Sequence, residues 1–340
     1  MTTRKARREG IAAMAARASV AALMVSIACL GAGAHAADKY PDRPITLIVP
    51  FSAGGDADLA ARNLAASMRD TLGAAMVVAN KAGANGSIGS KFVRDAAPDG
   101  YTLLLGRVGS QAILPALQAD LAYKWDDFTF IGVLELNPMV CVVNAKSRYQ
   151  NLDDLIAAIK ANPGKLNYST SGPATVLNLA SQALLKSASL PKTAAVPVAY
   201  KGGNEATTAV LSGEVDFTCN NLTSLLGHIK GDKLRVLVTT SPTRLKDLPD
   251  APTASELGHP KLEAVSGWSA LLGPPGMDRA LLEKWTGLLR QVDQNAQWRT
   301  AVETLGSVPR ILEPKATSDF VKDQVRLYGD LGQALGIQIK

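Results

Sequence analysis

Residues 45–72 read ITLIVPFSAGGDADLAARNLAASMRDTL and contain a complete strand, turn and helix. Residues 45–50 are continuously apolar and partly β-branched, which is typical of a buried parallel strand. A Gly-Gly turn follows, and residues 58–72 then place apolar side chains on one face of a helix, which Gly73 is positioned to end. This unit predicts an α/β fold in which strands alternate with helices.

The same alternation continues outward from this unit. Further strands are predicted at residues 76–79, 101–105, 128–134, 139–143, 166–169, 194–200, 215–220 and 234–240. A second unit begins near Pro138, and the last third of the chain reads as helical. Alternating strands and helices imply parallel sheets covered by helices, and such sheets bind ligands in the turns beyond the carboxyl ends of their strands.

Residues 1–36 have the three parts of a secretory signal peptide. A cationic start precedes an apolar run at residues 18–30, and Ala34-His35-Ala36 forms a small-x-small cleavage signature before Ala37. The apolar run is shorter than the ~20 residues of a membrane-spanning helix. We therefore expect export to the periplasm. A retained anchor, a twin-arginine signal at Arg7-Arg8 and lipid attachment at Cys29 are the less favoured alternatives.

The net charge and the cysteine content are consistent with an exported globular protein. The formal charge is +6, but residues 1–36 carry five Lys or Arg and one Glu, which leaves about +2 for the remainder and no argument for nucleic-acid binding. Cys141 and Cys219 lie in apolar, strand-like runs. Buried free thiols are the expected state, with a disulfide as the alternative.

Four turns contain groups that could bind an anion. Glycines allow close backbone approach, and the free N–H groups of a helix start favour negative charge. Asp58 is expected to be a structural cap of the helix rather than a ligand contact. Arg107 could present its guanidinium to a carboxylate, or it could be a surface residue or part of a salt bridge across a cleft. The candidate ligand-binding residues in the four turns are Phe51, Ser52, Ala53, Gly54, Gly55, Asp56; Asn85, Gly86, Ser87; Arg107, Val108, Ser110; and Ser171, Gly172, Thr175.

The sequence lacks the known arrangements of catalytic residues. His228 and His259 are the histidines after residue 36, and neither belongs to a metal-binding spacing. The chain has no Gly-x-Ser-x-Gly nucleophile motif, no phosphate-binding P-loop and no dinucleotide fingerprint. We therefore predict no catalytic residues, no metal and no cofactor. A secreted α/β enzyme acting on a small anionic substrate is the alternative.

An ordered set of motifs resembles the tripartite tricarboxylate transporter substrate-binding proteins, also called Bug receptors. The set covers essentially the whole chain after residue 36. The motifs are YPDRPI at residues 40–45, PFxxGGxxD at 50–58, APDGYTL at 97–103, NPGKLNY at 162–168, YKG at 200–202, GEVD at 213–216 and GDKLR at 231–235.

The resemblance implies a type II periplasmic binding protein fold, with two α/β domains around a ligand cleft joined by a hinge. Domain 1 would comprise residues 37–138 and the returning residues 259–340, and domain 2 residues 139–258. Family members bind small carboxylates, and some deliver them to a membrane transporter. The expected partners of this chain are therefore membrane components of such a transporter or the outer domain of a sensor kinase, on which the loaded receptor would dock, and the expected state is a monomer. The resemblance adds Tyr200, Lys201 and Asn220 to the candidate ligand-binding residues.

Two departures from the family pattern concern the expected ligand. Arg107 replaces a usual Thr or Ser, and Asn220 replaces a frequent Asp. Both changes favour a more anionic ligand. The hypothesis is a ligand with two or three carboxylates, or an aromatic acid, rather than an amino acid.

Overall fold

A single mixed sheet organises the part of the chain that the structure, a computed structural model, describes, which is residues 40–337 and 339. Its strands are β1 (Ile45–Val49), β2 (Met76–Asn80), β3 (Thr102–Arg107), β4 (Thr129–Asn144), β5 (Leu166–Thr170), β6 (Ala195–Ala199), β7 (Phe217–Asn221), β8 (Leu234–Thr239), β9 (Ser266–Gly273) and β10 (Val308–Pro309). The order is β2-β1-β3-β9-β4-β7-β5-β6, and β8 and β10 also pair with β4.

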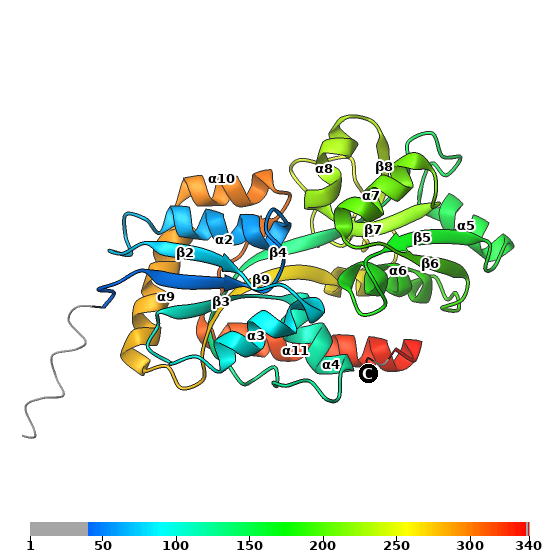
Figure 1. Cartoon of the computed structure of the whole chain (residues 1–340). Helices are drawn as coiled ribbons and strands as arrows, with labels where there is room; N and C mark the ends of the chain where they lie inside the picture. The colour runs from blue at the N-terminus through cyan, green and yellow to red at the C-terminus, as the bar shows by residue number, and fades with distance from the viewer. Residues whose placement is uncertain (1–39, 338, 340) are drawn as a thin grey trace, which may run out of the picture. The chain divides into compact units, whose positions relative to one another are not determined.

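Helices connect these strands and pack against them (Figure 1). The α-helices are α2 (Asp56–Ser67), α3 (Ser87–Arg94), α4 (Leu114–Leu117), α5 (Leu152–Ala161), α6 (Val176–Ser187), α7 (Gly203–Ser212), α8 (Leu222–Lys230), α9 (Arg279–Gln294), α10 (Ala296–Thr304) and α11 (Pro314–Leu335). Shorter helical turns are η2 (Ala84–Gly86), η3 (Gly109–Ile113) and η4 (Pro260–Ala264). Side chains of Asn151, Asp278 and Asn295 accept hydrogen bonds from the first backbone amides of α5, α9 and α10, which fixes where these helices begin.

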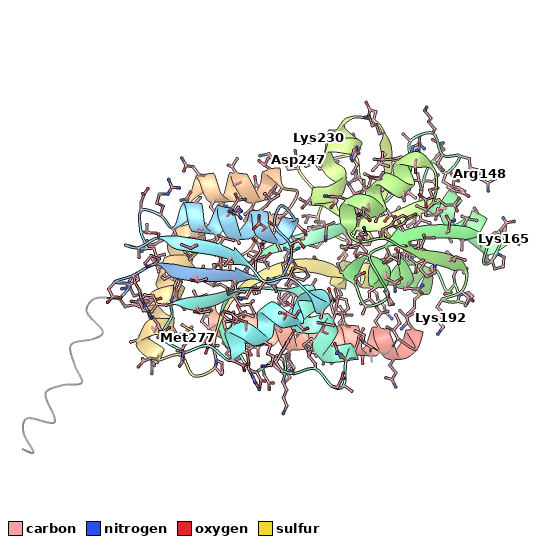
Figure 2. The ribbon with its side chains drawn as sticks, in the orientation of Figure 1. Arg148, Lys165, Lys192, Lys230, Asp247 and Met277 are labelled. Atoms are coloured by element: carbon pink, nitrogen blue, oxygen red, sulfur yellow. A yellow bond between two sulfur atoms is a disulfide. The ribbon has the colours of Figure 1, made fainter. Side chains whose placement is uncertain are left out.

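Strand β4 joins two halves of the sheet. Its N-terminal part pairs with β9 and β10, and its C-terminal part pairs with β7 and β8. The first half comprises β1, β2, β3, β9, β10 and the beginning of β4. The second half comprises β5 to β8 and the end of β4. The C-terminal helix α11 contacts η3, α4 and β4, and Lys192 donates a hydrogen bond of 2.7 Å to the Leu335 carbonyl at its end (Figure 2).

The core contains the apolar faces that the sequence predicts for the C-terminal helices. Trp285 of α9 and Val321 and Tyr328 of α11 are fully buried, as is Trp268 of β9. Burial raises the pKa of Tyr328, whose hydroxyl donates to the Ser266 carbonyl. Among the described residues, no helix combines the length and apolar character that crossing a membrane requires. The predicted signal peptide, its cleavage site and Cys29 lie outside the described residues.

The structure corrects three expectations about secondary structure and pairing. Residues 266–273, in the region read as helical, form β9 between β3 and β4. The predicted strands at 128–134 and 139–143 are one continuous strand, β4, that runs through Pro138. The sheet is mixed rather than parallel: β1 pairs in parallel with β2 and β3, and β5 with β6 and β7, whereas β9 and β4 run antiparallel to their neighbours.

The expectation of free thiols was wrong. Cys141 of β4 and Cys219 of β7 occupy directly opposite positions of an antiparallel pair and form a disulfide. The half-cystines are almost completely buried, at 2% and 0% exposure. This bond therefore ties the end of the connecting strand β4 to the second half of the sheet.

Candidate ligand-binding site

Three of the predicted turns meet at Gly86. Gly86 has a φ of +92°, and a Cβ atom there would lie 2.9 Å from the Ser110 Cβ and 3.1 Å from the Phe51 ring. A side chain at this position therefore has neither the backbone conformation nor the space that it needs. The close approach places the loops after β1, β2 and β3 side by side. Ala53 and Gly54 of the first turn are exposed, and Gly55 precedes α2 as its N-cap.

Asp58 holds the first turn in place. Its carboxylate accepts hydrogen bonds from the Gly54 backbone N–H at 3.0 Å and from Asn80 Nδ2 at 3.0 Å, and it pairs with Arg62 Nε at 2.9 Å. Because all of these donors belong to the protein, Asp58 is structural, as the sequence predicts. It does not cap α2 itself, because that position is taken by Gly55.

The hydrogen bond and charge of Arg62 lower the pKa of Asp58 from 3.8 to about 2, helped by the Gly54 and Asn80 donors. A carboxylate with a depressed folded-state pKa contributes stability that is present above pH 3.8 and lost as the pH falls through about 2. We expect Asp58→Asn to flatten the pH dependence of the unfolding free energy between pH 4 and 2 by about 1–2 kcal/mol. Urea unfolding across that range measures this, and an unchanged slope would contradict the role of Asp58.

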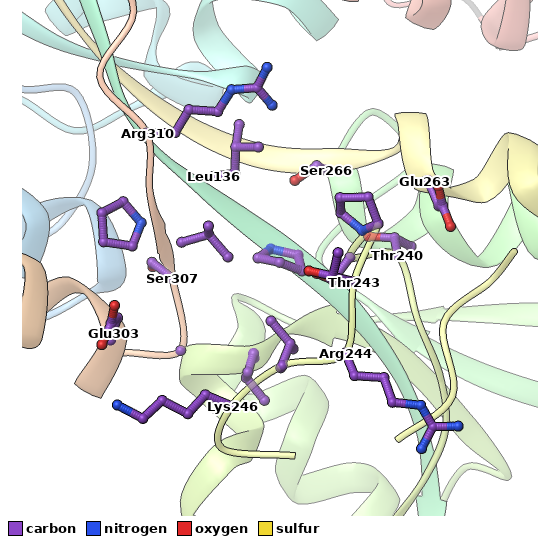
Figure 3. Close-up of a pocket in the computed structure, with 18 of the residues that line it drawn as sticks. Leu136, Thr240, Thr243, Arg244, Lys246, Glu263, Ser266, Glu303, Ser307 and Arg310 are labelled. Atoms are coloured by element: carbon purple, nitrogen blue, oxygen red, sulfur yellow. The ribbon is translucent and has the colours of Figure 1, made fainter. Parts of the chain in front are cut away.

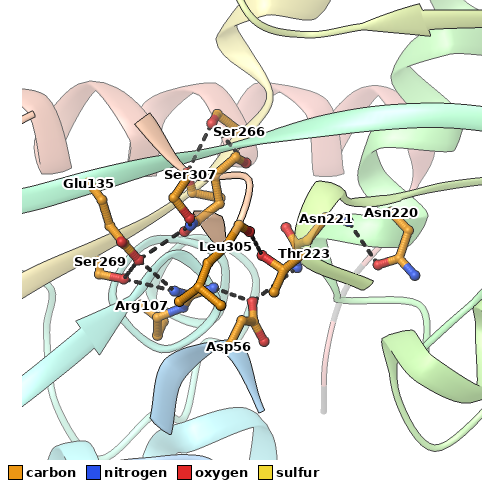
Figure 4. Close-up of polar contacts among 12 residues, drawn as sticks. Asp56, Arg107, Glu135, Asn220, Asn221, Thr223, Ser266, Ser269, Leu305 and Ser307 are labelled. Atoms are coloured by element: carbon orange, nitrogen blue, oxygen red, sulfur yellow. Dashed lines mark hydrogen bonds and ion pairs between the residues drawn. The ribbon is translucent and has the colours of Figure 1, made fainter. Parts of the chain in front are cut away.

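Arg107 is buried in an ion-pair network rather than exposed. Its Nη2 lies 2.6 Å from Asp56 Oδ2, its Nη1 donates to Ser269 Oγ at 2.7 Å, and Glu135 Oε1 lies 3.7 Å away (Figure 4). The geometry is a salt bridge, but its partners Asp56 and Glu135 lie in the same half of the sheet as Arg107, so it is not the salt bridge across a cleft that the sequence analysis offered as an alternative. Burial raises the pKa of Glu135 against the opposing effects of Arg107, Ser269 and Asn137. Val108, which follows Arg107, is also buried.

The network continues into the second half of the sheet. Asn221 Nδ2 donates to Asp56 Oδ2 at 3.3 Å, and Asn85 Nδ2 donates to the Ala174 carbonyl at 3.1 Å. These two contacts bring the first two turns against the turns after β7 and β5. Asn221 was not predicted from the sequence, and its Oδ1 is buried without a hydrogen-bond partner among the described residues.

Asn220, which the resemblance nominated, has a different role. It is fully buried, its Nδ2 donates to the Gly203 carbonyl at 2.8 Å and to Thr207 Oγ1 at 3.1 Å, and its Oδ1 accepts from the Asn221 backbone N–H at 2.8 Å. These bonds attach the start of α7 to the end of β7. In this structure Asn220 therefore positions Asn221, which is the residue that lies against Asp56.

The fourth turn is partly bonded to itself. Thr170 Oγ1 and Thr175 Oγ1 both donate to the Gly172 carbonyl, at 3.2 Å and 2.8 Å. The hydroxyls of Ser52, Ser87 and Ser171 have no side-chain hydrogen bond to another described residue, and they remain available to a ligand. Ser110 is not available in the same way, because its hydroxyl lies within hydrogen-bond distance of Gln111 Nε2 and of the Arg107 backbone.

Lys201 is an exposed cation near these turns. It has no ion pair with another described residue, whereas the hydroxyl of its neighbour Tyr200 donates to Glu214 at 2.8 Å. Five helices begin at the turns that the sequence singled out or next to them: α2, α3, α6, α7 and α8. Their free N–H groups and dipoles, together with Lys201, favour an anionic ligand. Among the described residues, no group of three or more His, Cys, Asp or Glu could hold a metal ion.

Comparison with known proteins decides the family. Residues 60–337 match the model of the tripartite tricarboxylate transporter family receptor. The chain belongs to this family. It is 34% identical to protein BugT of Bordetella pertussis over 328 residues, covering 94% of this chain and 98% of BugT. It is 36% identical over 277 residues to a protein encoded in the TAR-I ttuE-ttuC' intergenic region of Agrobacterium vitis, covering 81% of this chain and 79% of that protein.

Solved structures of family receptors have the same fold. The periplasmic binding protein BugD is 31% identical, with a TM-score of 0.76 over 88% of this chain and 100% of BugD. MatC from Rhodopseudomonas palustris, solved with bound malate, is 27% identical, with a TM-score of 0.74 over 86% of this chain and 99% of MatC. The predicted fold class is confirmed. As a member of this family the chain is a solute-binding receptor and not an enzyme.

Proposed function

We propose that this receptor captures a small dicarboxylate in the periplasm, at the turns that meet around Gly86. The observation that carries the proposal is the convergence of helix starts and unbonded hydroxyls from both halves of the sheet, next to the unpaired Lys201. MatC, whose match covers 86% of this chain and 99% of MatC, was solved with bound malate, which supports a dicarboxylate as the ligand.

One carboxylate would accept hydrogen bonds from the hydroxyls and helix-start amides of the first half, at Ser52 and Ser87. The other would bind Ser171 and Lys201 in the second half. Arg107 contributes through its charge and by holding Asp56, because its donors are already directed to Asp56 and Ser269. A tricarboxylate or an aromatic acid would use the same groups.

Binding would bring the two halves of the sheet together. We place domain 1 at residues 37–138 and 259–340 and domain 2 at residues 139–258, with β4 and the segment between β8 and β9 passing between them. A ligand that contacts both domains favours the closed arrangement by its differential affinity. The closed receptor then docks on membrane components of a transporter or on a sensor kinase outer domain.

We place the receptor in the periplasm after removal of residues 1–36, and as a monomer. The family and its structural relatives, which include periplasmic binding proteins, support this location. Mass spectrometry of the exported protein should give a chain that begins at Ala37. A chain that retains the N-terminal segment would contradict the proposed processing.

Malate, succinate and related dicarboxylates should raise the thermal unfolding temperature by several degrees. At ~100 times its dissociation constant, a ligand adds roughly 2.7 kcal/mol of stability. A thermal-shift screen of mono-, di- and tricarboxylates, aromatic acids and amino acids measures this. Lys201→Gln should weaken the response, whereas Lys165→Gln, which removes an exposed charge at the start of β5, should not. A flat response across all acids would overturn the proposed function.

A further inference from the structure

A pocket of about 440 Å³ lies beside β4, apart from the turns described above (Figure 3). None of the predicted ligand-binding residues lines it. Its walls come from the middle of β4, the segment 240–247 after β8, the segment 303–310 that includes β10, and α11. Its volume is in the range of small-molecule sites.

The pocket offers an apolar surface for the body of a ligand. Leu136, Leu222, Val308 and Phe320 contribute to its lining. Phe320 is held from behind by an edge-to-face contact with the buried Trp268, with ring centroids 5.6 Å apart. A rigid aromatic wall of this kind favours a flat or aromatic partner.

The charged groups that line the pocket include two cations without an ion-pair partner among the described residues. Asp247 is neutralised by Lys230 at 2.7 Å (Figure 2), and Arg244 by Glu256 at 3.0 Å. Arg310 and Lys246 make no ion pair with another described residue. Glu263 accepts the Ser255 backbone N–H at 3.1 Å, and neither Glu263 nor Glu303 makes an ion pair or a side-chain hydrogen bond with another described side chain.

Two hydroxyls supply further hydrogen-bond donors. The hydroxyls of Ser241 and Thr243 donate to no other described residue. Arg310 and Leu136 both line the pocket, and Figure 3 shows them toward one end of it, with Lys246 toward the other. A cation next to an apolar wall, with free hydroxyls nearby, is complementary to a ligand that has one anionic group on an apolar body.

We infer that this pocket is a second binding site, which takes a small organic anion with an aromatic body. The anionic group would bind Arg310, and the ring would lie against Leu136 and Phe320. The inference goes beyond the proposed receptor function and does not depend on it. The two sites are nevertheless connected, because Asn137 Nδ2 donates both to Ser307 in the pocket wall, at 2.6 Å, and to Glu135 in the Arg107 network, at 3.3 Å.

Calorimetric titration of the purified protein with 2-naphthoate tests the site. We expect the uncharged 2-naphthamide and the ring-free acetate each to bind at least tenfold more weakly. Arg310→Gln should weaken 2-naphthoate binding by about tenfold, the worth of one charge-assisted hydrogen bond, and Arg310→Lys should restore part of it. Thr243→Trp should abolish binding by filling the pocket. Arg69→Gln removes an exposed cation outside the pocket and serves as the matched control.

The variants also distinguish this site from the turns. Arg310 and Thr243 are exposed, so the variants should fold, which circular dichroism and their unchanged thermal response to dicarboxylates would verify. Absence of 2-naphthoate binding to the unaltered protein overturns the inference. So does an unchanged affinity in both Arg310→Gln and Thr243→Trp, because the probe would then occupy another site. Neither result affects the proposed dicarboxylate site.

Discussion

Arg107→Ala is expected to lower the free energy of unfolding at pH 7 by about 3–5 kcal/mol, the usual cost of removing one partner from a buried ion pair. Glu135 would be left almost fully buried without its cation, and Asp56 would lose its 2.6 Å contact. Protonation of Glu135, whose pKa is already raised by burial, should limit the loss. The effect should therefore be smaller at low pH. Urea unfolding at several pH values measures both quantities.

Two controls separate this effect from a general loss of charge. Arg279→Ala removes a guanidinium that is 90% exposed and pairs with Glu283, and it should cost less than about 1 kcal/mol. The double variant Arg107→Met, Glu135→Leu should recover most of the stability, because the fully buried charge of Glu135 is gone and Asp56, whose side chain is 31% exposed, keeps its hydrogen bond from Asn221. Equal unfolding midpoints for Arg107→Ala and the unaltered protein would contradict the network. Unchanged dicarboxylate affinity in Arg107→Ala would show that Arg107 supports ligand binding neither through its charge nor by holding Asp56.

Loss of the disulfide should be the other large effect. Cys141 and Cys219 are 78 residues apart, and closing a loop of that length reduces the entropy of the unfolded chain by an amount worth about 4 kcal/mol at 25 °C. The Cys141→Ala, Cys219→Ala variant should therefore unfold at a clearly lower urea concentration. Dithiothreitol should shift the unaltered protein in the same direction.

The reducing agent should leave the double alanine variant unchanged, which makes that variant the control for nonspecific effects. If reduction and the double substitution both leave the urea midpoint where it was, the disulfide does not contribute to stability. Two free thiols per unfolded, unreduced chain in a thiol titration would show that the bond is absent from the exported protein. Cys29, if retained, would add one further thiol to that count.

The strand–turn–helix units of the first half were predictable because their information is local. The apolar run of β1, the Gly-Gly turn and the amphipathic α2 lie within 28 consecutive residues. The loops around Gly86 and Arg107 are likewise each encoded by a short continuous stretch of sequence. The rule that ligands bind beyond strand ends then selected loops that the structure brings together. The structural role of Asp58 was also assigned correctly, because its partners Gly54 and Arg62 are four residues away on either side, although the expected capping of α2 was wrong.

What the sequence could not show depends on partners far apart in the chain. The apolar run of β9 is short enough to suit a strand or a helix, and its pairing with β3 and β4 spans more than a hundred residues. The number of residues between Cys141 and Cys219 does not show which residues of β4 and β7 lie opposite each other. Their juxtaposition follows only from the pairing of β4 with β7. Asn220 and Asn221 are neighbours, and in a strand adjacent side chains point to opposite faces. Selecting Asn220 instead of Asn221 from the sequence alone therefore takes the buried residue in place of the one that faces Asp56.

Strand β4 makes the receptor sensitive to changes in chain length at one place. Between residues 135 and 141, odd positions carry Glu135, Asn137 and Cys141, while even positions carry Leu136 and Pro138 of the pocket. One added or deleted residue near Pro138 would reverse this alternation for everything beyond it, separating Cys141 from Cys219 while the first half kept its frame. Insertions are thus tolerable in the exposed loops, whereas the crossing strand must keep a constant number of residues for both halves to assemble together.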